Sequence, residues 1–490
     1  MRISLLAAAI TLATATSAVR AADTRLTVYS GGYDAVVQSE AMPGGPGYAL
    51  VASELGFDLA QGSNAVQLGG LPAALDASSA RLRPQGEAQV RGQRFDFALA
   101  GQDDLLRRTL GQTVTVEQSV GDSRQSYTGV LLAAGNGLTL RLPDGRVKVL
   151  ANYSNFELPR LPAGLVNEPT LSWDLVAARA GRQSFDLAYA TAGLAWRADY
   201  QVDVSGGARA CRMDLEGAAM VANRAGADFN DVALTLVAGE PNRTQASGPQ
   251  IMKANRAEMA MDSYAGAPAS PEASGEYHAY RIPGSADLPQ GSVQRIPLIA
   301  PARSVDCDRQ YETRAPMGSW RPPQPMIDAN FNAVEGEQPV IASLGFRNAK
   351  AGGLGAPLPA GRVRVFDAGN LLGEAMLGHT PANADVKLGL GTVFDLTAER
   401  KREEFRLDRA GRQMEERISV LVRNAKDEAA TVRIHEAMPR WSDWEIVSTT
   451  VQPGQRDAQS AQFDLAVPAG GEARLTYTVR YRWAPDVRID

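Results

Sequence analysis

Histidine, cysteine and aromatic residues are scarce in this chain of 490 residues. It has three histidines, two cysteines and 6% aromatic residues. Acid–base catalysis and metal centres draw heavily on histidine, and here His278, His379 and His435 lie far apart in the sequence. The two cysteines lack the Cys-x-x-Cys spacing of a zinc site. The sequence therefore predicts no catalytic, cofactor-binding or metal-binding residues.

Three further absences narrow the class of protein. The chain has neither the Gly-x-Ser-x-Gly turn of a serine hydrolase nor the Gly-Lys pair of a phosphate-binding loop. Its net charge of -5 offers no basic excess for binding nucleic acid. Beyond the first residues no apolar run approaches the length of about 18 residues that a membrane helix needs, so no transmembrane span is expected in the mature chain.

The amino-terminal residues have the pattern of a secretory signal peptide. Arg2 precedes an apolar run from Ile3 to Ala15, and small residues follow up to Ala21. We therefore expect residues 1–21 to be cleaved and the protein to be exported, most simply into a bacterial periplasm.

The alternation of apolar and polar residues is the clearest structural pattern in the sequence, and it indicates β-strands. From Trp196 to Val204, large apolar residues alternate with Arg197, Asp199 and other polar residues, which predicts a long half-buried strand. The same period of two recurs along the chain as far as Trp483. We expect a mainly β fold of antiparallel β-sandwich-like modules.

A different pattern fills residues 101–162. Asp103 can cap a short helix that Gly111 ends. Turn signals at Gly135-Asn136-Gly137 and at Asp144-Gly145 then separate short strands. A helix followed by short, sharply turned strands resembles a small SH3-like barrel, so we expect a separate module here.

Three stretches interrupt the plain alternation. Residues 244–276 are rich in Ala, Ser, Pro and Gly and predict a mobile insertion, while residues 313–337 carry four prolines and predict a loop. The charged stretch from Glu399 to Arg417 contains a turn signal at Arg409-Ala410-Gly411, which favours a hairpin over a helix.

The sequence Arg-Asn-Ala-Lys occurs twice, at residues 347–350 and 423–426, each time after an apolar strand. Asparagine tolerates a left-handed backbone and hydrogen-bonds its own turn. Both copies therefore predict connections between strands of sandwich-type sheets.

Several segments together resemble a bacterial family. The stretches "SFDLAYATAGLAWRADYQVDV", "GRVRVFDAGNLLGEAMLGHTP" and "RNAKDEAATVRIHEAMPRWSDWEIV" are similar to the domain of unknown function 4139 of mucoidy-inhibitor-like proteins. The resemblance covers about residues 171–483. An earlier segment, "GSNAVQLGGLPAALDASSARLRP", is similar to the amino-terminal partner domain of those proteins. The resemblance implies an exported β-rich protein and transfers no catalytic residue.

These signals together predict the domain order. We expect a signal peptide at 1–21, an amino-terminal β domain at 22–100 and the SH3-like module at 101–162. The family-like β domain then covers 163–490, with the insertion 244–276 and the loop 313–337 inside it.

Cys211 and Cys307 each lie on an apolar strand face. In an oxidising compartment they can form one disulfide, closing a loop of about 100 residues and stabilising the fold by about 4 to 5 kcal/mol in the chain-entropy account. The alternative is two separate buried thiols.

Two acidic groups are the strongest remaining candidates for chemistry. Asp443 and Glu445 beside Trp441 and Trp444 could be paired carboxylates of a glycosidase, or solvated acids at a sheet edge. Asn223, Asp228, Asn230 and Asp231 could offer oxygen atoms to calcium, although turn formation explains them equally well.

The expected function is that of an exported, non-enzymatic protein that binds or organises a component of the cell envelope, a protein or a glycan. The alternative is a hydrolase of envelope carbohydrate or peptide, with Asp443 and Glu445 as its acids. A third alternative is an outer-membrane barrel, against which the irregular strand spacing argues.

Overall fold

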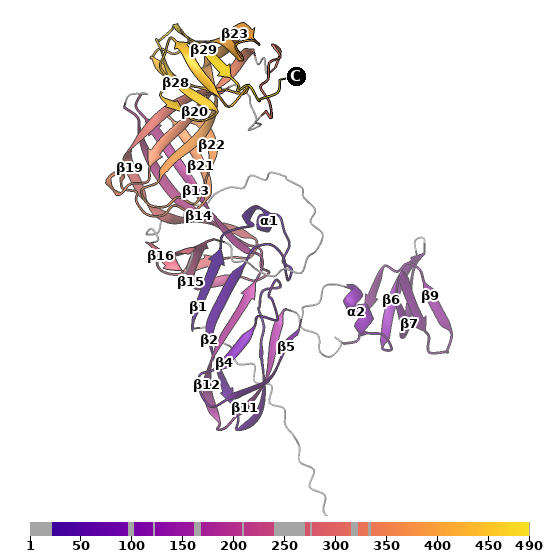
Figure 1. The fold of residues 1–490 in the computed structure, drawn as a ribbon. Coiled ribbons are helices and arrows are strands. Elements are labelled where there is room, and N and C mark those ends of the chain that lie inside the picture. The colour runs from indigo at the N-terminus through magenta and orange to yellow at the C-terminus, as the bar shows by residue number, and fades with distance from the viewer. Residues whose placement is uncertain are drawn as a thin grey trace, which may run out of the picture. The chain divides into compact units, whose positions relative to one another are not determined.

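The computed structural model describes residues 22–96, 102–120, 123–160, 168–207, 210–239, 270–274, 277–314, 322–331 and 335–489. β-Strands dominate these ranges (Figure 1). The helical elements are short: α1 (Tyr33–Val37), α2 (Gln102–Arg108) and the 3-10 turn η1 (Lys350–Gly352). The mainly β fold predicted from alternation is therefore confirmed. The expected signal peptide lies outside the described residues.

The chain divides into two compact units. Unit 1 comprises residues 1–197 and 220–296, and unit 2 comprises residues 198–219 and 297–490. The division falls within β13 (Leu194–Ser205) and β14 (Arg212–Asn223). It does not fall at residue 163, where the sequence predicts a domain boundary.

Unit 1 contains an eight-stranded sheet with the order β16-β17-β15-β1-β2-β12-β4, in which β18 also pairs with β15. Its strands are β1 (Ala22–Tyr29), β2 (Ala49–Leu59), β4 (Arg81–Pro84), β12 (Gly181–Thr191), β15 (Phe229–Ala238), β16 (Ser270–Ser274), β17 (Tyr277–Arg281) and β18 (Ala286–Leu288). A smaller sheet has the order β3-β11-β5. Its strands are β3 (Gly62–Leu68), β5 (Gln89–Asp96) and β11 (Thr170–Ala177).

Strands on the two sides of the predicted boundary at residue 163 pair with each other. β12 pairs antiparallel with β2 from Gly181 to Thr191, and β15 pairs parallel with β1. The alternation that buries Phe185 and Leu187 identifies a strand. It does not identify the strand's partner, because any neighbour with a matching apolar face would satisfy the pattern. The amino-terminal sheet is thus completed by residues that follow 163.

The module at 101–162 is an antiparallel five-stranded sheet with the order β10-β6-β7-β8-β9. Its strands are β6 (Thr113–Val120), β7 (Ser123–Gly135), β8 (Gly137–Arg141), β9 (Val147–Leu150) and β10 (Asn155–Glu157). Gly111, with φ of 80°, lies between α2 and β6, where the sequence predicts the end of a helix. The SH3-like character of this sheet stays a prediction.

Unit 2 is built on a sheet with the order β22-β21-β13-β14-β19-β20-β23-β24-β29-β26. The new strands are β19 (Ser292–Arg314), β20 (Gly336–Arg347), β21 (Gly361–Asp367), β22 (Asn370–Leu377), β23 (Asp385–Asp408), β24 (Gln413–Asn424), β26 (Trp444–Thr449) and β29 (Glu472–Arg482). Three more strands are β25 (Ala430–Ala437), β27 (Gln455–Arg456) and β28 (Ser460–Val467). β28 pairs antiparallel with both β25 and β27, and β25 also runs parallel to β19.

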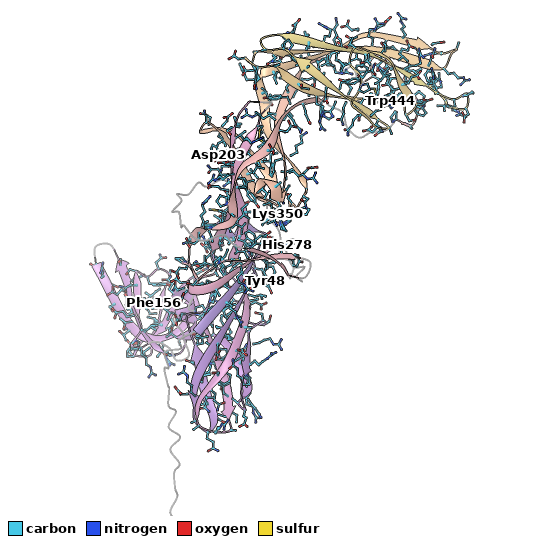
Figure 2. All side chains as sticks on the ribbon, turned by 90° about the vertical axis from the view of Figure 1, so that its left-hand side faces the viewer. Tyr48, Phe156, Asp203, His278, Lys350 and Trp444 are labelled. Atoms are coloured by element: carbon cyan, nitrogen blue, oxygen red, sulfur yellow. A yellow bond between two sulfur atoms is a disulfide. The ribbon has the colours of Figure 1, made fainter. Side chains whose placement is uncertain are left out.

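The carboxyl-terminal part of unit 2 is a sandwich with one apolar core. Ile418 of β24 and Val479 of β29 belong to the same buried cluster as Val432 of β25 and Phe463 of β28. Trp444 also lies in this core (Figure 2). We call this part the C-terminal sandwich.

Buried asparagines hold the ends of three strands. Asn424, in the second Arg-Asn-Ala-Lys copy, donates to the carbonyls of Glu428 and Pro468 and accepts from the Lys426 amide. Asn348 makes three equivalent bonds at the end of β20. Asn223, at the end of β14, does the same outside the repeated motif. The asparagines therefore serve as strand-end clamps, and none has the left-handed backbone that the sequence allowed.

The irregular stretches have mixed outcomes. The charged stretch is a hairpin of β23 and β24, as predicted, with Asp408 opposite Gln413. β19 extends to Arg314 and β20 begins at Gly336, so strands enter both ends of the expected loop 313–337. Of the expected insertion 244–276, only β16 lies within the described residues.

Candidate binding trough in unit 2

The three histidines lie on separate elements. His278 is exposed on β17, and His379 is exposed and accepts a hydrogen bond from the Ala360 amide through Nδ1. Only His435, on β25, is half-buried among other charged groups. Within the described ranges no three His, Cys, Asp or Glu side chains are grouped as metal ligands would be. None of the described helices could cross a membrane.

The structure gives Asp443 and Glu445 structural partners. One oxygen of Glu445 lies 3.2 Å from Arg480 and 2.7 Å from Arg482, while Asp443 is exposed. Trp444 is buried, and its indole N–H donates to the Ala458 carbonyl. An acid held between two arginines and a tryptophan turned into the core do not form a sugar-stacking acid pair.

The oxygen groups considered for calcium are also used locally. The side-chain oxygen of Asn223 accepts the Ala225 amide inside the fold, and Asp228 accepts the Gln290 amide at 2.7 Å. Asp231 lines a hollow of unit 1 and adopts a left-handed backbone with φ of 53°. These residues form hydrogen bonds within turns, which is the alternative explanation to calcium binding.

A polar trough runs along one face of β19, β20 and β23. Directly opposed residues on antiparallel strands share a face. Asp308, Gly345 and Lys387 are opposed across the three strands, and the next row is Gln310, Ser343 and Gly389. The middle strand β20 therefore carries small residues, β19 supplies carboxylate and amide groups, and β23 supplies the ammonium group of Lys387 beside Gly389.

The trough contains a shallow hollow of about 490 Å³. Its lining residues are Asp306, Cys307, Asp308, Gln310, Gly345, Phe346, Asp385, Val386 and Lys387. A Cβ added at Gly389 would meet no atom within 4 Å. Gly389 does not line the hollow itself but follows its lining residue Lys387 by two positions on β23, and the space above Gly389 is open.

An ion cluster closes the trough beyond Gln310. Glu312 is 9% exposed, pairs with Lys387, and lies 3.2 Å from Arg314 and 3.5 Å from His435. Burial acts to raise the pKa of Glu312, but the hydrogen bonds and charges of Lys387 and Arg314 outweigh it and hold the pKa below 4.5. Glu312 is therefore a carboxylate at neutral pH.

His435 has the opposite electrostatic setting. Burial lowers its pKa below 6.5, and the positive charges of Arg314, Lys387 and Arg433 lower it further against the attraction of Glu312. The imidazole is therefore neutral at pH 7. Its buried Nε2 makes no hydrogen bond to a described group.

Ser343 adds a second unsatisfied polar group to this face. It is 5% exposed, and its Oγ has no hydrogen-bond partner among the described residues. A buried hydroxyl without a partner costs free energy, which a ligand or an ordered water can recover. The Ser343 hydroxyl therefore has hydrogen-bonding capacity that no described group uses, although it is buried and does not line the hollow.

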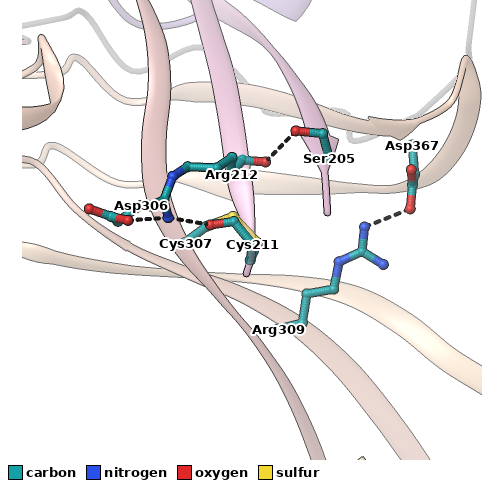
Figure 3. Close-up of a disulfide and its surroundings, with 7 residues drawn as sticks. All are labelled: Ser205, Cys211, Arg212, Asp306, Cys307, Arg309 and Asp367. Atoms are coloured by element: carbon teal, nitrogen blue, oxygen red, sulfur yellow. Dashed lines mark hydrogen bonds and ion pairs between the residues drawn. A yellow bond between two sulfur atoms is a disulfide. The ribbon is translucent and has the colours of Figure 1, made fainter. Parts of the chain in front are cut away.

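A disulfide lies at one end of the trough. Cys211, just before β14, is joined to Cys307 of β19, with 5.1 Å between the Cα atoms (Figure 3). Arg212 pairs with Asp306 beside it, and Arg309 contacts Asp367 at 2.6 Å. The bond ties β14 to the strand that forms one wall of the trough. The two cysteines therefore form a disulfide and are not two separate buried thiols.

The core of the C-terminal sandwich contains a second polar cluster. Glu436 of β25 is 1% exposed and bonds Arg400 of β23 at 3.0 Å and the Tyr477 hydroxyl at 2.6 Å. Burial raises the pKa of Tyr477 well above 10, and the charge of Glu436 adds to this, so the phenol stays protonated and donates. The cluster joins facing layers of the sandwich.

A neighbouring arginine organises a loop. Arg440 is fully buried, lies 2.8 Å from Glu416 and donates to the carbonyls of Met326 and Asp328 at 2.7 Å. This guanidinium fixes the described residues 322–331 against the sandwich. Sequence reasoning missed both buried pairs, because inward-facing Glu416 and Glu436 lie in strands whose other charges face solvent.

The burial of Asp199 also differs from what the alternation of the strand predicts. It lies on the polar side of the predicted strand 196–204, yet it is 4% exposed because Arg362 and Arg364 of the parallel strand β21 each reach it at 3.1 Å. The signal that could have found it is the alternation of Arg362 and Arg364 with valines in β21, which predicts an arginine face for a carboxylate.

The comparison with protein families agrees with the resemblance noted in the sequence. The model described as "Domain of unknown function (DUF4139)" matches residues 185–485, which is more than half of the chain. No curated protein and no solved structure matches the chain.

Proposed function

The chain belongs to the DUF4139 family, and from this premise we propose that it is an exported, non-catalytic protein that binds a polar component of the cell envelope in the trough of unit 2. The component would be a carbohydrate or a peptide, because the trough is lined by carboxylate, amide and ammonium groups. The observation that carries the proposal is the shallow hollow of about 490 Å³, to which Asp308, Gln310 and Lys387 contribute polar groups.

Two features support export. The first 21 residues have the composition of a signal peptide. The Cys211–Cys307 disulfide is of a kind that persists in oxidising compartments such as the periplasm.

The arrangement of charges supports binding over catalysis. Glu312, Glu416, Glu436 and Glu445 each lie within salt-bridge distance of at least one basic side chain. A general acid needs a raised pKa near the working pH, whereas Lys387 and Arg314 lower the pKa of Glu312. Glu416, Glu436 and Glu445 stabilise the C-terminal sandwich, and Glu312 belongs to the ion cluster at the trough.

The binding proposal is tested by blocking the trough. Gly389→Leu places a side chain two positions from Lys387 at the border of the hollow, and Gly86→Leu is its control, because a Cβ at Gly86 in unit 1 also meets no atom within 4 Å. Isothermal titration with soluble peptidoglycan fragments should show binding to the wild type and to Gly86→Leu. Gly389→Leu should bind at least about tenfold more weakly with an unchanged melting temperature.

Equal binding by all three proteins would refute the trough as the site. Release of reducing sugar or free peptide ends by the wild type, lost in Glu445→Gln, would instead support the hydrolase alternative. Export is tested separately: cell fractionation should find a mature chain beginning near Ala22 outside the cytoplasm, and a full-length cytosolic protein would contradict it.

A further inference from the structure

We infer that the free edge of β9 in the five-stranded sheet is a docking site for an extended, acidic segment of another protein, which adds to the sheet as a new strand. This site is independent of the trough and of the function proposed for it. The inference rests on backbone groups, exposed side chains and local charge.

Among the described strands none pairs with the outer edge of β9, so its backbone presents hydrogen-bonding groups that these strands do not use. β9 ends the strand order, with β8 on its other side. The Leu142 amide donates to the Arg146 carbonyl at 2.8 Å, which makes this opposed pair a hydrogen-bonded one. Bonded and non-bonded pairs alternate along an antiparallel ladder, so Val147 and Val149 belong to non-bonded pairs with Arg141 and Thr139. Their N–H and C=O groups therefore point to the open edge.

The side chains of the same two residues are exposed. Val147 is 59% and Val149 is 68% exposed, on the face of the sheet opposite to the buried Leu138 and Leu140. Exposed edges in natural sheets usually carry a proline, a bulge or an outward lysine. Lys148 does not serve this purpose, since its ammonium lies 4.6 Å from the centre of the Tyr127 ring. An incoming strand would cover both valines.

The charge near β9 selects the partner. From residue 137 to 150 the chain carries three cations, Arg141, Arg146 and Lys148, and one anion, Asp144. Asp144 is held by Arg146 at 2.6 Å. This excess of positive charge stands out in a chain whose net charge is -5. A second copy brings the same positive charge to the edge, whereas an acidic strand neutralises it.

The test uses the full mature chain and a fluorescein-labelled peptide of five Val-Glu repeats, with five Val-Lys repeats as the matched control. Fluorescence anisotropy should show binding of the Val-Glu peptide that weakens as salt is raised. The Val-Lys peptide should not bind. Hydrogen exchange in the complex should protect the Val147 and Val149 amides.

Two variants separate the edge from the fold. Val149→Pro removes one outward donor without removing a bond to β8, and proline is tolerated at such edge positions. It should weaken binding of the Val-Glu peptide about tenfold. Val149→Thr keeps the amide and the branched shape, and it should bind within about threefold of the wild type.

Either of two results would overturn the inference. The first is absence of binding, or binding that leaves residues 147–150 unprotected in the wild type. The second is self-association of the wild type that Val149→Pro abolishes, which would assign the edge to a second copy of the chain.

Discussion

The C-terminal sandwich and the five-stranded sheet are both antiparallel β structures, but they are stabilised differently. Among the described residues the sandwich buries 22 apolar side chains in one cluster, and the sheet buries seven. The sandwich also encloses the pairs of Arg400 with Glu436 and of Arg440 with Glu416. The sheet keeps its charges at the surface and leaves two edge valines exposed.

The difference predicts how each region responds to the loss of a side chain. Buried ion pairs fix the alignment of the two layers of the sandwich. When one partner of such a pair is lost, the remaining buried charge destabilises the fold. A small core has no such internal partners, so its strength depends on a few side chains and its edges stay open. Unit 2 is suited to a rigid site, and the sheet is suited to pairing with another strand.

Loss of the disulfide should have the largest effect, because it should destabilise unit 2 and leave the five-stranded sheet unchanged. Cys211 and Cys307 are 96 residues apart, so the chain-entropy account gives a loss of about 4 to 5 kcal/mol for the Cys211→Ala/Cys307→Ala variant. Urea unfolding of the C-terminal sandwich, followed by hydrogen exchange of the amide of the buried Val479, should shift to lower urea. The five-stranded sheet, followed by hydrogen exchange of the Leu131 amide, should not shift. A common shift of both would contradict separate stabilisation.

Loss of Glu436 should destabilise the sandwich next most. Glu436→Ala leaves Arg400 buried without its carboxylate and should cost about 3 to 5 kcal/mol. The matched control, Glu445→Ala, removes a half-exposed pair with Arg480 and should cost less than about 1 kcal/mol. Denaturant midpoints measure both. Equal effects would show that the interior pair is no more important than the surface one.

A core truncation in the small sheet should have a smaller, local effect. Leu131 is fully buried in a cluster of seven, and Leu131→Ala should cost about 2 to 4 kcal/mol. Because few other side chains support this core, hydrogen exchange should show the sheet opening while unit 2 stays protected. Opening of unit 2 in the same variant would contradict independent cores.

The smallest effect is the pH dependence of the ion cluster in the trough. The pKa of His435 is below 6.5 in the folded chain, so the unfolded chain binds its proton first and stability falls as the pH drops below about 6.5. The pKa of Glu312 is held below 4.5, so its contribution is present above 4.5 and is lost on further acidification. His435→Gln should reduce the change in the urea midpoint between pH 7 and pH 5. An unchanged slope would show that His435 is not the titrating group.

Local patterns predicted the elements well, and the physical reason is clear. The alternation at Trp196 and the turn at residues 409–411 depend on neighbours in sequence, so a strand and a hairpin follow directly. The domain boundary at 163 stays a prediction, and strands on its two sides pair with each other because strand partners come from distant segments. The burial of Asp199 and Glu436 was missed for the same reason: their arginines lie on other strands.

The trough could not be predicted because its chemistry is spread over three strands. Ser343 and Gly389 carry no motif, and only the register of β20 with β23 brings them together. Glu312 and His435 are more than a hundred residues apart and meet through the parallel pairing of β19 with β25. A single sequence contains no signal for such register.

The most direct test of the trough is photo-cross-linking from a position at its border in intact cells. The photoreactive residue p-benzoylphenylalanine at position 389 enters open space, and at position 86 it serves as the control. The proposed function predicts adducts with envelope carbohydrate or peptide from position 389 that an excess of soluble peptidoglycan fragments removes, and none from position 86. Equal or absent adducts at the two positions would contradict it.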